Sequence, residues 1–189
     1  MTSSAARACA FLDRDGTLIE ERGYAHHPAD YAVLPGAHQA VARLRAAGFA
    51  VVVITNQSGI GRGVFSAVDY AAFEGLLLRD FAAHGAALDG CYHCPHTPDA
   101  ACDCRKPGTA LALRAAREHG IDLTRSWVIG DKESDVELAR NLACRAVLVL
   151  TGHGAEQIER VPAGTRIARD VADAVARYVL ANAPAQSER

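Results

Sequence analysis

Two aspartates that stand one residue apart, Asp13 and Asp15, carry the clearest chemical signal in this sequence. They directly follow the apolar run Ala8–Leu12 and precede Gly16 and Thr17. Uncompensated carboxylates are costly to bury, so a pair at the end of a buried strand favours a cation site and catalysis over a purely structural role. One aspartate could attack an electrophile while the other moves a proton. A solvated turn, for which Asp-Gly is common, is the alternative that the dipeptide alone leaves open.

Three further polar segments extend this signal. The segment Thr55–Gly63 follows an apolar run with a hydroxyl, amides and flexible glycines, and its backbone N–H groups could surround an anion. Arg105 and Lys106 supply adjacent cations, and Asp131 follows the apolar run Trp127–Gly130. Each segment taken singly also fits ordinary loop, surface or helix-capping chemistry.

Taken together, these residues fit phosphoryl transfer. Asp13 and Asp131 offer hard oxygen ligands for Mg²⁺, which uses few carboxylates and keeps some of its waters. Thr55 and Lys106 would hold the transferring oxygens, over which charge spreads in the transition state. Asp15 would protonate the leaving alkoxide and then deprotonate a water that hydrolyses an aspartyl-phosphate on Asp13.

A second cluster suits a metal of a different kind. Three thiolates and one imidazole in two close pairs match a closed tetrahedral zinc site. We expect a structural zinc that stiffens the loop at about 90–107 and so positions Arg105 and Lys106. Unligated packing or redox thiols are the alternative, and Cys91 and His93 rank below the expected ligands. These ligands are Cys94, His96, Cys102 and Cys104.

Short apolar runs alternate with helical patterns along the chain, which predicts an α/β fold with a parallel sheet and helices on both faces. Asp13, Thr55 and Asp131 end different strands, so they should meet at the carboxyl edge of the sheet, where such sheets bind ligands. The predicted strands are Ala8–Leu12, Ala50–Thr55, Leu88–Tyr92, Trp127–Gly130, Ala146–Leu150 and Arg166–Ala168. The predicted helices are Gly36–Ala47, Ser66–His84, Thr109–His119, Ser134–Ala143 and Val171–Leu180, with Ala181–Arg189 as a frayed tail.

The composition is that of a single globular domain. The chain has 189 residues, of which 50% are hydrophobic, and a formal net charge of −2. We therefore predict one domain over residues 1–189, without nucleic acid or an anionic membrane as partner. The sequence has neither a signal-peptide core nor a run of roughly 20 apolar residues, which predicts a cytoplasmic protein. A monomer is expected because no large apolar surface helix stands out.

The chemistry-bearing segments resemble the four motifs of the haloacid dehalogenase superfamily. These are Asp13-x-Asp15-Gly-Thr, the strand-ending Thr55, Lys106, and Gly130-Asp131-x-x-x-Asp135. Within that superfamily, Asp-Arg-Asp-Gly-Thr, Thr-Asn-Gln-Ser-Gly-Ile-x-Arg-Gly and Cys-Pro-His…Cys-x-Cys-Arg-Lys-Pro resemble the D,D-heptose 1,7-bisphosphate phosphatases and the related histidinol-phosphatases. The resemblance implies a Rossmann-like core with no large cap, Mg²⁺ in the active site and a structural zinc in a loop insertion.

The resemblance also implies roles for individual residues. Asp13 would be the nucleophile and Asp15 the acid and base. Mg²⁺ would be held by Asp13, the backbone carbonyl of Asp15 and Asp131, while Thr55 and Lys106 would stabilise the phosphoryl group. The residues expected to contact substrate are Glu21, Arg22, Gly23, Tyr24, Asn56, Gln57, Ser58, Arg105 and Lys132.

The activity implied by the resemblance is Mg²⁺-dependent hydrolysis of the 7-phosphate of D-glycero-D-manno-heptose 1,7-bisphosphate, with this sugar phosphate as the partner. The alternative is a phosphatase for histidinol phosphate or another small phosphorylated metabolite. The short spacing from His96 to Cys102 does not separate the two, because histidinol-phosphatases also show it. A phosphotransferase that keeps its phosphoenzyme, and a zinc-stabilised binding module, are further alternatives. The intact carboxylate pair disfavours the binding module.

Overall fold

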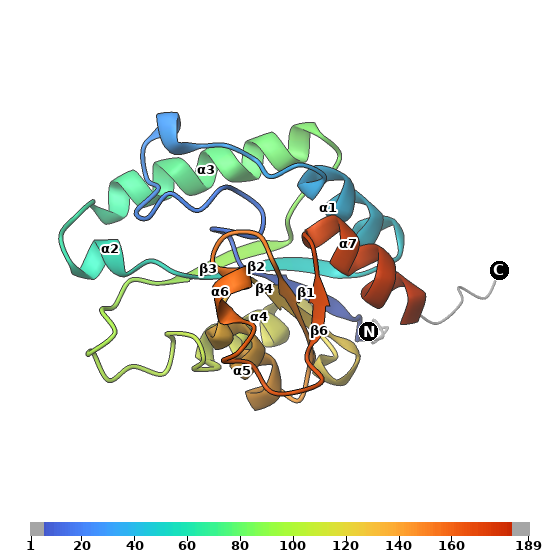
Figure 1. Ribbon diagram of the computed structural model, residues 1–189. Helices are drawn as coiled ribbons and strands as arrows, with labels where there is room; N and C mark the ends of the chain where they lie inside the picture. Colours follow the sequence, from blue (N-terminus) through green and yellow to red (C-terminus); the bar gives the residue numbers. More distant parts are fainter. Residues whose placement is uncertain (1–5, 183–189) are drawn as a thin grey trace.

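The structure, a computed structural model, describes residues 6–182 and has one parallel sheet at its centre (Figure 1). Within these residues the sheet has six strands in the order β3-β2-β1-β4-β5-β6, and neighbouring strands are parallel, as predicted. The strands are β1 (Cys9–Leu12), β2 (Ala50–Asn56), β3 (Gly90–Cys94), β4 (Trp127–Gly130), β5 (Arg145–Val149) and β6 (Arg166–Ala168).

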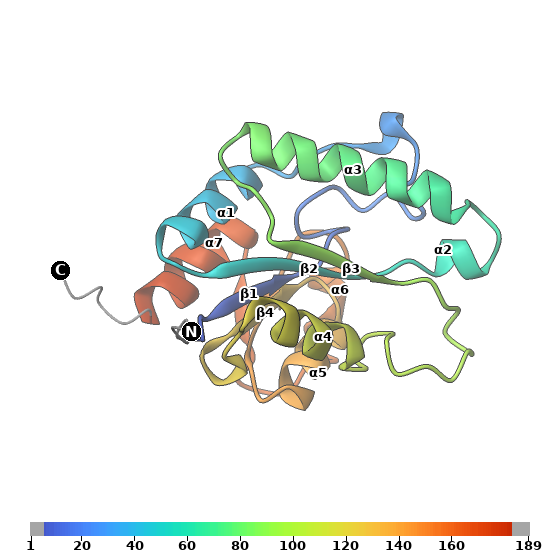
Figure 2. The same ribbon diagram turned by 180° about the vertical axis from the view of Figure 1, so that it is seen from behind.

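Helices cover both faces of the sheet, which explains why its central strands are apolar along their length. α1, α3 and α7 lie on one face, and α4 and α5 lie on the other (Figures 1 and 2). The helices are α1 (Ala37–Ala46), α2 (Ser58–Gly61), α3 (Ala67–Ala83), α4 (Ala110–His119), α5 (Glu133–Asn141), α6 (Gly154–Gln157) and α7 (Val171–Ala174). Shorter turns are η1 (Pro28–Asp30), η2 (Leu123–Arg125), η3 (Val175–Val179) and η4 (Leu180–Asn182). None of the helices in the described part of the chain has the length and apolar character needed to cross a bilayer.

Alternate side chains of the central strands enter two separate hydrophobic clusters. Leu12, Val51 and Val53 pack under α1, α3 and α7, whereas Phe11 and Val52 pack under α4 and α5. All of these side chains are fully buried. The central strands are therefore buried on both faces of the sheet. Polar residues follow at their ends, where the functional groups lie.

Local sequence signals mark the start of α3 and the end of α4. The N–H of Asp69 donates to the side chain of Ser66, and the Asp69 carboxylate accepts the N–H of Ser66, which forms a capping box at the start of α3. Gly120 ends α4 in the left-handed conformation with φ of 61°.

The predicted position of β3 is wrong by two residues. β3 spans Gly90–Cys94 rather than Leu88–Tyr92, because β2 continues to Asn56 and pairs with Cys94 at that point. The irregular part of the predicted loop therefore begins only at Pro95.

The C-terminal helix is less regular than predicted. The predicted helix Val171–Leu180 is α-helical only to Ala174 and then continues through a wider π turn and a 3₁₀ turn. Val175 and Val179 remain fully buried in that π turn, so core packing continues past the end of the α-helix. Most of the predicted tail Ala181–Arg189 lies outside the described residues.

The glycines that follow β2 serve close packing rather than flexibility. Ser58–Gly61 forms one helical turn where the sequence predicts a flexible loop. A Cβ atom on Gly59 would lie 2.1 Å from Cε1 of Phe65, so only glycine fits against that ring. Gly61 donates its N–H to the carbonyl oxygen of Pro95 at 2.9 Å, which joins α2 to the segment after β3.

Candidate active site

Asp13, Thr55 and Asp131 meet at the carboxyl edge of the sheet. β1 lies between β2 and β4, and the strand order reverses there, which is where open α/β sheets form their ligand crevice. An open cavity of about 450 Å³ lies beside Asp15 and Lys106. The residues predicted to contact substrate that line it are Glu21, Gly23, Tyr24, Asn56, Gln57, Ser58, Arg105 and Lys132.

The ammonium group of Lys106 joins two buried carboxylates. Its Nζ lies 2.8 Å from Oδ1 of Asp13 and 2.6 Å from Oδ1 of Asp135, and it donates to the carbonyl oxygen of Ile54 at 2.7 Å. Burial alone would raise the pKa of Asp13, but Lys106 and Lys132 outweigh it and hold that pKa below its usual value. Asp13 is therefore ionised at neutral pH, as a nucleophile must be.

Asp13, Asp131 and Asp135 form a buried carboxylate cluster, with oxygens within 4.8 Å of one another. Oδ2 of Asp131 accepts the N–H of His153 at 2.9 Å, whereas its buried Oδ1 has no hydrogen-bond partner among residues 6–182. Burial and the nearby Asp13 raise the pKa of Asp131 to about 8. An unpartnered buried carboxylate oxygen that faces like charges fits a hard divalent cation such as Mg²⁺.

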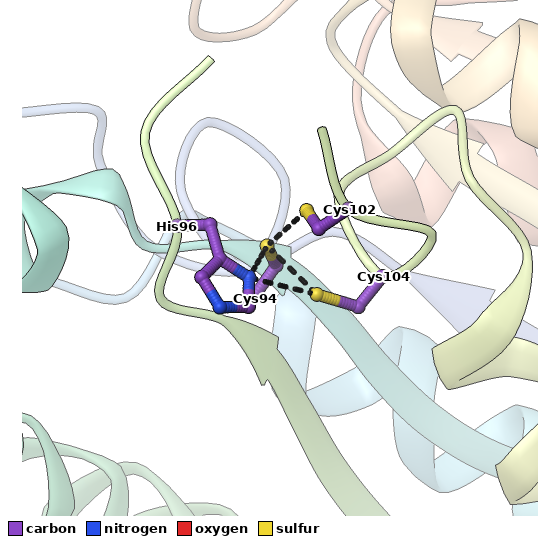
Figure 3. Close-up of side chains that lie close together, drawn as sticks. All are labelled: Cys94, His96, Cys102 and Cys104. Carbon is purple, nitrogen blue, oxygen red and sulfur yellow. Dashed lines mark hydrogen bonds between the residues drawn. The ribbon is translucent and has the colours of Figure 1, made fainter. Parts of the chain in front are cut away.

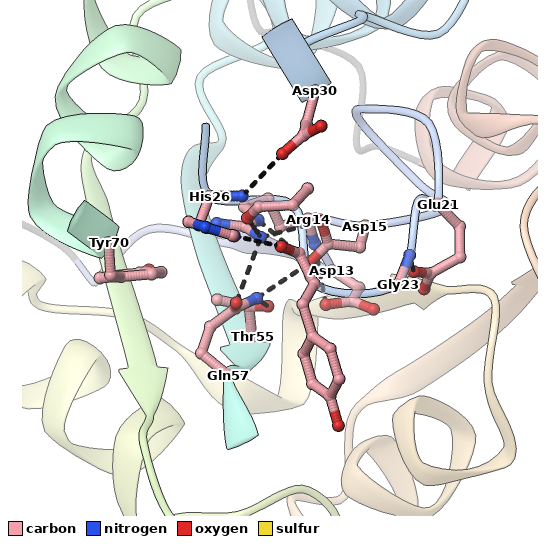
Figure 4. Close-up of polar contacts among 12 residues, drawn as sticks. Asp13, Arg14, Asp15, Glu21, Gly23, His26, Asp30, Thr55, Gln57 and Tyr70 are labelled. Carbon is pink, nitrogen blue, oxygen red and sulfur yellow. Dashed lines mark hydrogen bonds and ion pairs between the residues drawn. The ribbon is translucent and has the colours of Figure 1, made fainter. Parts of the chain in front are cut away.

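Asp15 is held by Arg14 and Gln57 (Figure 4). Nη2 of Arg14 donates to Oδ1 of Asp15 at 2.9 Å, and Nε donates to Oδ2 at 3.0 Å. Nε2 of Gln57 donates both to Oδ2 of Asp15 at 2.8 Å and to Oγ1 of Thr55 at 2.9 Å. Burial raises the pKa of Asp15, and Arg14 offsets only part of this rise. A raised pKa suits a group that gives and takes a proton near neutral pH.

Arg14 is a site residue that sequence reasoning missed. It is fully buried, and Nη2 also donates to the carbonyl oxygen of Ala25 at 3.0 Å. Its guanidinium lies 4.9 Å from the ring centre of Phe73, which packs on it from α3. An arginine placed between two aspartates directly after a buried strand is a signal that could have found it.

Asn56 fastens the segment that carries Lys106. The backbone N–H of Lys106 donates to Oδ1 of Asn56 at 2.9 Å, and Nδ2 of Asn56 donates to the carbonyl oxygen of Lys106 at 3.2 Å. The sequence analysis expects Asn56 to contact substrate. In the structure its amide lines the cavity but is bonded on both sides to this backbone, so β2 itself fixes the position of Lys106.

Glu21, Lys132 and His153 form a polar group in the cavity wall that sequence reasoning did not assemble. Nζ of Lys132 lies 2.8 Å from Oε2 of Glu21, and Nε2 of His153 lies 3.6 Å from the same oxygen. Arg22, also predicted to contact substrate, lies outside the cavity lining and pairs instead with Glu20 at 2.7 Å. The loop after β1 thus supplies Glu21 to the cavity and turns Arg22 away from it.

The four residues of the predicted zinc site come together after β3 (Figure 3). Sγ of Cys94 lies 3.1 Å from Sγ of Cys104 and 3.8 Å from Sγ of Cys102, and Nδ1 of His96 lies 3.2 Å from Sγ of Cys104. Zinc bonds of about 2.0–2.3 Å in a tetrahedron separate the ligand atoms by roughly 3.3–3.8 Å. Burial raises the pKa of the Cys94 thiol to about 12, so a nearby cation would be needed to ionise it at neutral pH. These residues could hold a metal ion.

Cys91 and His93 do not join this cluster. Sγ of Cys91 lies 3.8 Å from the hydroxyl of Tyr70, and the ring of His93 lies 4.1 Å from the Tyr70 ring centre. Both therefore face α3, because residues two apart on a strand share a face, while Cys94 faces the opposite way.

Comparison with known proteins agrees with the geometry of the site. Residues 103–174 match the family model described as HAD-hydrolase-like. The crystal structure of D,D-heptose 1,7-bisphosphate phosphatase from B. bronchiseptica, complexed with magnesium and phosphate, matches with a TM-score of 0.85 at 34% identity, covering 92% of this chain and 99% of that one. The corresponding phosphatase from Burkholderia thailandensis matches with a TM-score of 0.69 at 31% identity, covering 90% and 97%. The fold and the site are those of a haloacid dehalogenase-like phosphatase.

Curated relatives narrow this class. D-glycero-beta-D-manno-heptose-1,7-bisphosphate 7-phosphatase of Pseudomonas aeruginosa is 37% identical over 177 residues, which cover 93% of this chain and 99% of the relative. The enzyme of the same name from Photorhabdus laumondii is 43% identical over 136 residues, covering 68% and 72%. This chain belongs to the family of D-glycero-beta-D-manno-heptose-1,7-bisphosphate 7-phosphatases.

Proposed function

We propose that this protein hydrolyses the 7-phosphate of D-glycero-D-manno-heptose 1,7-bisphosphate in a Mg²⁺-dependent reaction. The observation that carries the proposal is the buried group of Asp13, Asp131 and Lys106 beside a cavity that also contains Asp15. Relatives matched over nearly the whole chain are named for this activity. The heptose monophosphate product would enter nucleotide-activated heptose biosynthesis.

Asp13 would attack the phosphorus atom, while Asp15 gives a proton to the departing sugar oxygen. This step forms an aspartyl-phosphate and breaks the ester bond. Thr55 and Lys106 would stabilise the oxygens of the transferring group. Mg²⁺, held by Asp13, Asp131 and the backbone carbonyl of Asp15, would supply positive charge that offsets repulsion between carboxylate and phosphate.

The second step releases phosphate. Asp15, now ionised, would take a proton from a water molecule whose oxygen attacks the phosphorus atom. The bond to Asp13 breaks, and the free carboxylate is restored. Arg14 and Gln57 keep Asp15 in place for both proton transfers, because each donates to its carboxylate.

Arg105 would bind the phosphate that is not removed. Lys106 and Lys132 are each paired with carboxylates. In contrast, no carboxylate within residues 6–182 forms an ion pair with Arg105, which contacts the carbonyl oxygen of His96 at 3.5 Å. A guanidinium in the cavity lining with its charge uncompensated suits a second phosphate group.

The cysteine and histidine cluster would hold a structural zinc ion. Four protein ligands leave no open coordination position, so the metal would shape the segment before Lys106 rather than take part in the reaction. The cytoplasmic location, the single domain over 1–189 and the monomeric state stay predictions from the sequence.

A substrate panel tests the proposed function. Phosphate release by the full chain with Mg²⁺ would be measured on both anomers of the heptose bisphosphate, on histidinol phosphate and on fructose 1,6-bisphosphate. We expect kcat/KM at least about tenfold higher on a heptose bisphosphate, which corresponds to about 1.4 kcal/mol of transition-state stabilisation. Equal values on all substrates, or a preference for histidinol phosphate, would reject the assignment.

Asp13→Asn is the matched control for this panel, because it keeps the shape of the side chain and removes the nucleophilic charge. We expect phosphate release to fall by at least about 10³-fold, with unchanged circular dichroism and metal content in the cysteine cluster. Release at the wild-type rate would contradict the role of Asp13.

A further inference from the structure

A cluster of metal-ligand side chains lies where α1 meets the last turns of α3, outside the phosphatase site. His38 from α1, Asp80 from α3 and His84, the residue directly after α3, each offer a ligand atom, and these atoms lie within 4.8 Å of one another. None of the three lines the cavity beside Asp15. Since α1 and α3 cover the same face of the sheet, the cluster joins two neighbouring helices (Figure 1).

The carboxylate of Asp80 organises this cluster. Its Oδ2 lies 2.7 Å from Nε2 of His38 and accepts the hydroxyl of Tyr31 at 2.7 Å. Nδ1 of His84 lies 2.8 Å from the backbone carbonyl oxygen of Asp80 and 3.5 Å from its Oδ1. The two imidazole rings are stacked, with 4.0 Å between their centres and 11° between their planes. His38 thus contacts the carboxylate of Asp80 directly, and His84 holds a nitrogen beside both the backbone carbonyl and the carboxylate of the same residue.

The cluster is shielded on its inner side and open on its outer side. The ring of Phe81 lies 4.6 Å from that of His38, and Tyr31 covers the carboxylate. The side chain of His84 is 53% exposed, whereas those of His38 and Asp80 are 20% and 25% exposed.

The donor set selects a class of metal. Imidazole nitrogen suits Zn²⁺, Ni²⁺, Co²⁺ and Cu²⁺, whereas Mg²⁺ and Ca²⁺ take oxygen ligands. Two imidazoles and one carboxylate also form the protein ligands of several zinc sites that keep open positions. The hydrogen bond from Tyr31 to Asp80 matches the outer hydrogen bonds that orient ligating carboxylates in metal sites.

We propose that His38, Asp80 and His84 form a surface site for a divalent transition metal, separate from the phosphatase centre and from the cysteine cluster. The exposure of His84 leaves coordination positions open to solvent. A metal bound there would connect the start of α1 to the end of α3 and stabilise this face of the sheet, because it binds the folded chain only.

Co²⁺ titration of the chelator-treated full chain tests this site. Excess Mg²⁺ is present throughout, so that the oxygen site at Asp13 is occupied. Co²⁺ in the cysteine cluster gives thiolate-to-metal charge-transfer absorption, whereas Co²⁺ at His38 and His84 does not. Beyond the Co²⁺ that fills the cysteine cluster, we expect one further equivalent of Co²⁺ to bind without growth of the charge-transfer band. Zn²⁺ should displace this further equivalent.

Variants show which residues bind this further equivalent of Co²⁺. His38→Gln and His84→Gln should each lose it, and Tyr31→Phe should weaken it about tenfold. His119→Gln on α4 is the matched control, because it removes a histidine from the opposite face of the sheet, and it should bind as wild type does. Phosphate release by these variants should stay at the wild-type level. If wild type binds no further equivalent, or if His38→Gln and His84→Gln retain it, the proposal is wrong.

Discussion

Asp13 and Asp15 stand one residue apart, yet the pKa of Asp13 is lowered and that of Asp15 is raised. The difference has a structural cause. Lys106 and Lys132 act on Asp13, whereas burial dominates at Asp15 and Arg14 offsets only part of it. Environments that shift the pKa values of two carboxyl groups in opposite directions are typical of sites where one group is ionised and the other transfers a proton.

Gln57→Leu tests how the position of Asp15 is maintained. The substitution removes one donor from both Asp15 and Thr55 while nearly keeping the side-chain volume. We expect kcat to fall about tenfold to a hundredfold with little change in KM. Losing a hydrogen bond to the ionised form raises the pKa of Asp15, which must be protonated to give its proton to the leaving group, so the basic limb of the pH profile of kcat/KM should move to higher pH.

Gln39→Leu, an exposed glutamine on α1, is the control for this experiment and should leave both measurements unchanged. Wild-type kcat together with an unshifted profile in Gln57→Leu would show that Gln57 does not position Asp15.

The meeting of Asp13, Thr55 and Asp131 at one edge of the sheet could be predicted from the sequence because each follows or ends a buried apolar run. All three lie within one residue of the end of a strand, and parallel strands bring their carboxyl ends together. The partners of these groups could not be predicted in the same way. Lys132 meets Glu21 across 111 positions of sequence, and such a contact depends on how the loops fold back over the sheet.

At the scale of elements, the segment after β3 has two separate anchors. The cluster of Cys94, His96, Cys102 and Cys104 closes one part of it, and Asn56 at the end of β2 binds the backbone of Lys106. With the proposed zinc bound, the first anchor would depend on a metal ion, whereas the second is made by protein groups alone.

Cys102→Ser tests the metal-dependent anchor. Removing one thiolate from a four-ligand site should abolish stoichiometric zinc and lower the Tm, because metal that binds only the folded chain adds to its stability. Metal analysis and thermal unfolding measure both effects. Cys144→Ser, which changes a cysteine outside the cluster, should retain zinc. Equal zinc content and Tm in Cys102→Ser and wild type would contradict the assignment.

Asp89 connects the beginnings of β2 and β3. Its carboxylate accepts the N–H of Val51 at 2.8 Å and pairs with Arg7 at 2.8 Å and Arg45 at 3.1 Å. Burial alone would raise the pKa of Asp89, but the Val51 hydrogen bond and Arg7 outweigh it and the net pKa is lowered. The carboxylate thus helps to set the register at this end of the sheet.

Asp89→Asn should destabilise the protein more at pH 7 than at pH 3. Because the folded-state pKa lies below the unfolded value of about 4, the stabilisation is complete above that value and is lost as the pH falls through the folded pKa. We expect urea unfolding to show a loss of about 1–2 kcal/mol at pH 7. Glu159→Gln, at an exposed position, should show no such dependence. A loss of the same size at both pH values would refute this role.

Elements with strong local signals could be predicted well, and those set by distant contacts could not. The capping box at Ser66 and the glycine at position 120 mark the ends of α3 and α4 in the sequence itself. The extent of β3 depends instead on how far β2 runs beside it. The turn Ser58–Gly61 depends on Phe65 packing over Gly59, so its glycines mimic a flexible loop.

For the molecule as a whole, one sheet separates two hydrophobic clusters, and its strands contribute side chains to both of them. Trp127, the single tryptophan of the chain, lies on the central strand β4 and is 1% exposed. The guanidinium groups of Arg145 and Arg166 lie 5.1 Å and 5.4 Å from its ring centres. Its fluorescence therefore reports on the centre of the fold.

This position predicts one cooperative unfolding transition for the metal-loaded protein. Trp127 fluorescence and far-UV circular dichroism should give the same urea midpoint, because neither hydrophobic cluster can persist once the shared sheet is lost. Ellipticity that falls at a separate midpoint from the fluorescence would show that the chain holds two independently folding units.

Asn56 fixes both polar groups of the Lys106 backbone, and the cysteine and histidine cluster brings His96 close to Cys102 and Cys104. Residues 97–101 therefore form a loop whose two ends are held by the cluster. Pro98, Asp99 and Ala101 in this stretch are exposed. Chain length here can change without moving the ammonium group, at an entropic cost of only about 0.6 kcal/mol for each doubling of the loop. Evolution or protein engineering can therefore graft a new recognition segment onto the enzyme at this point and leave its catalytic centre as it is.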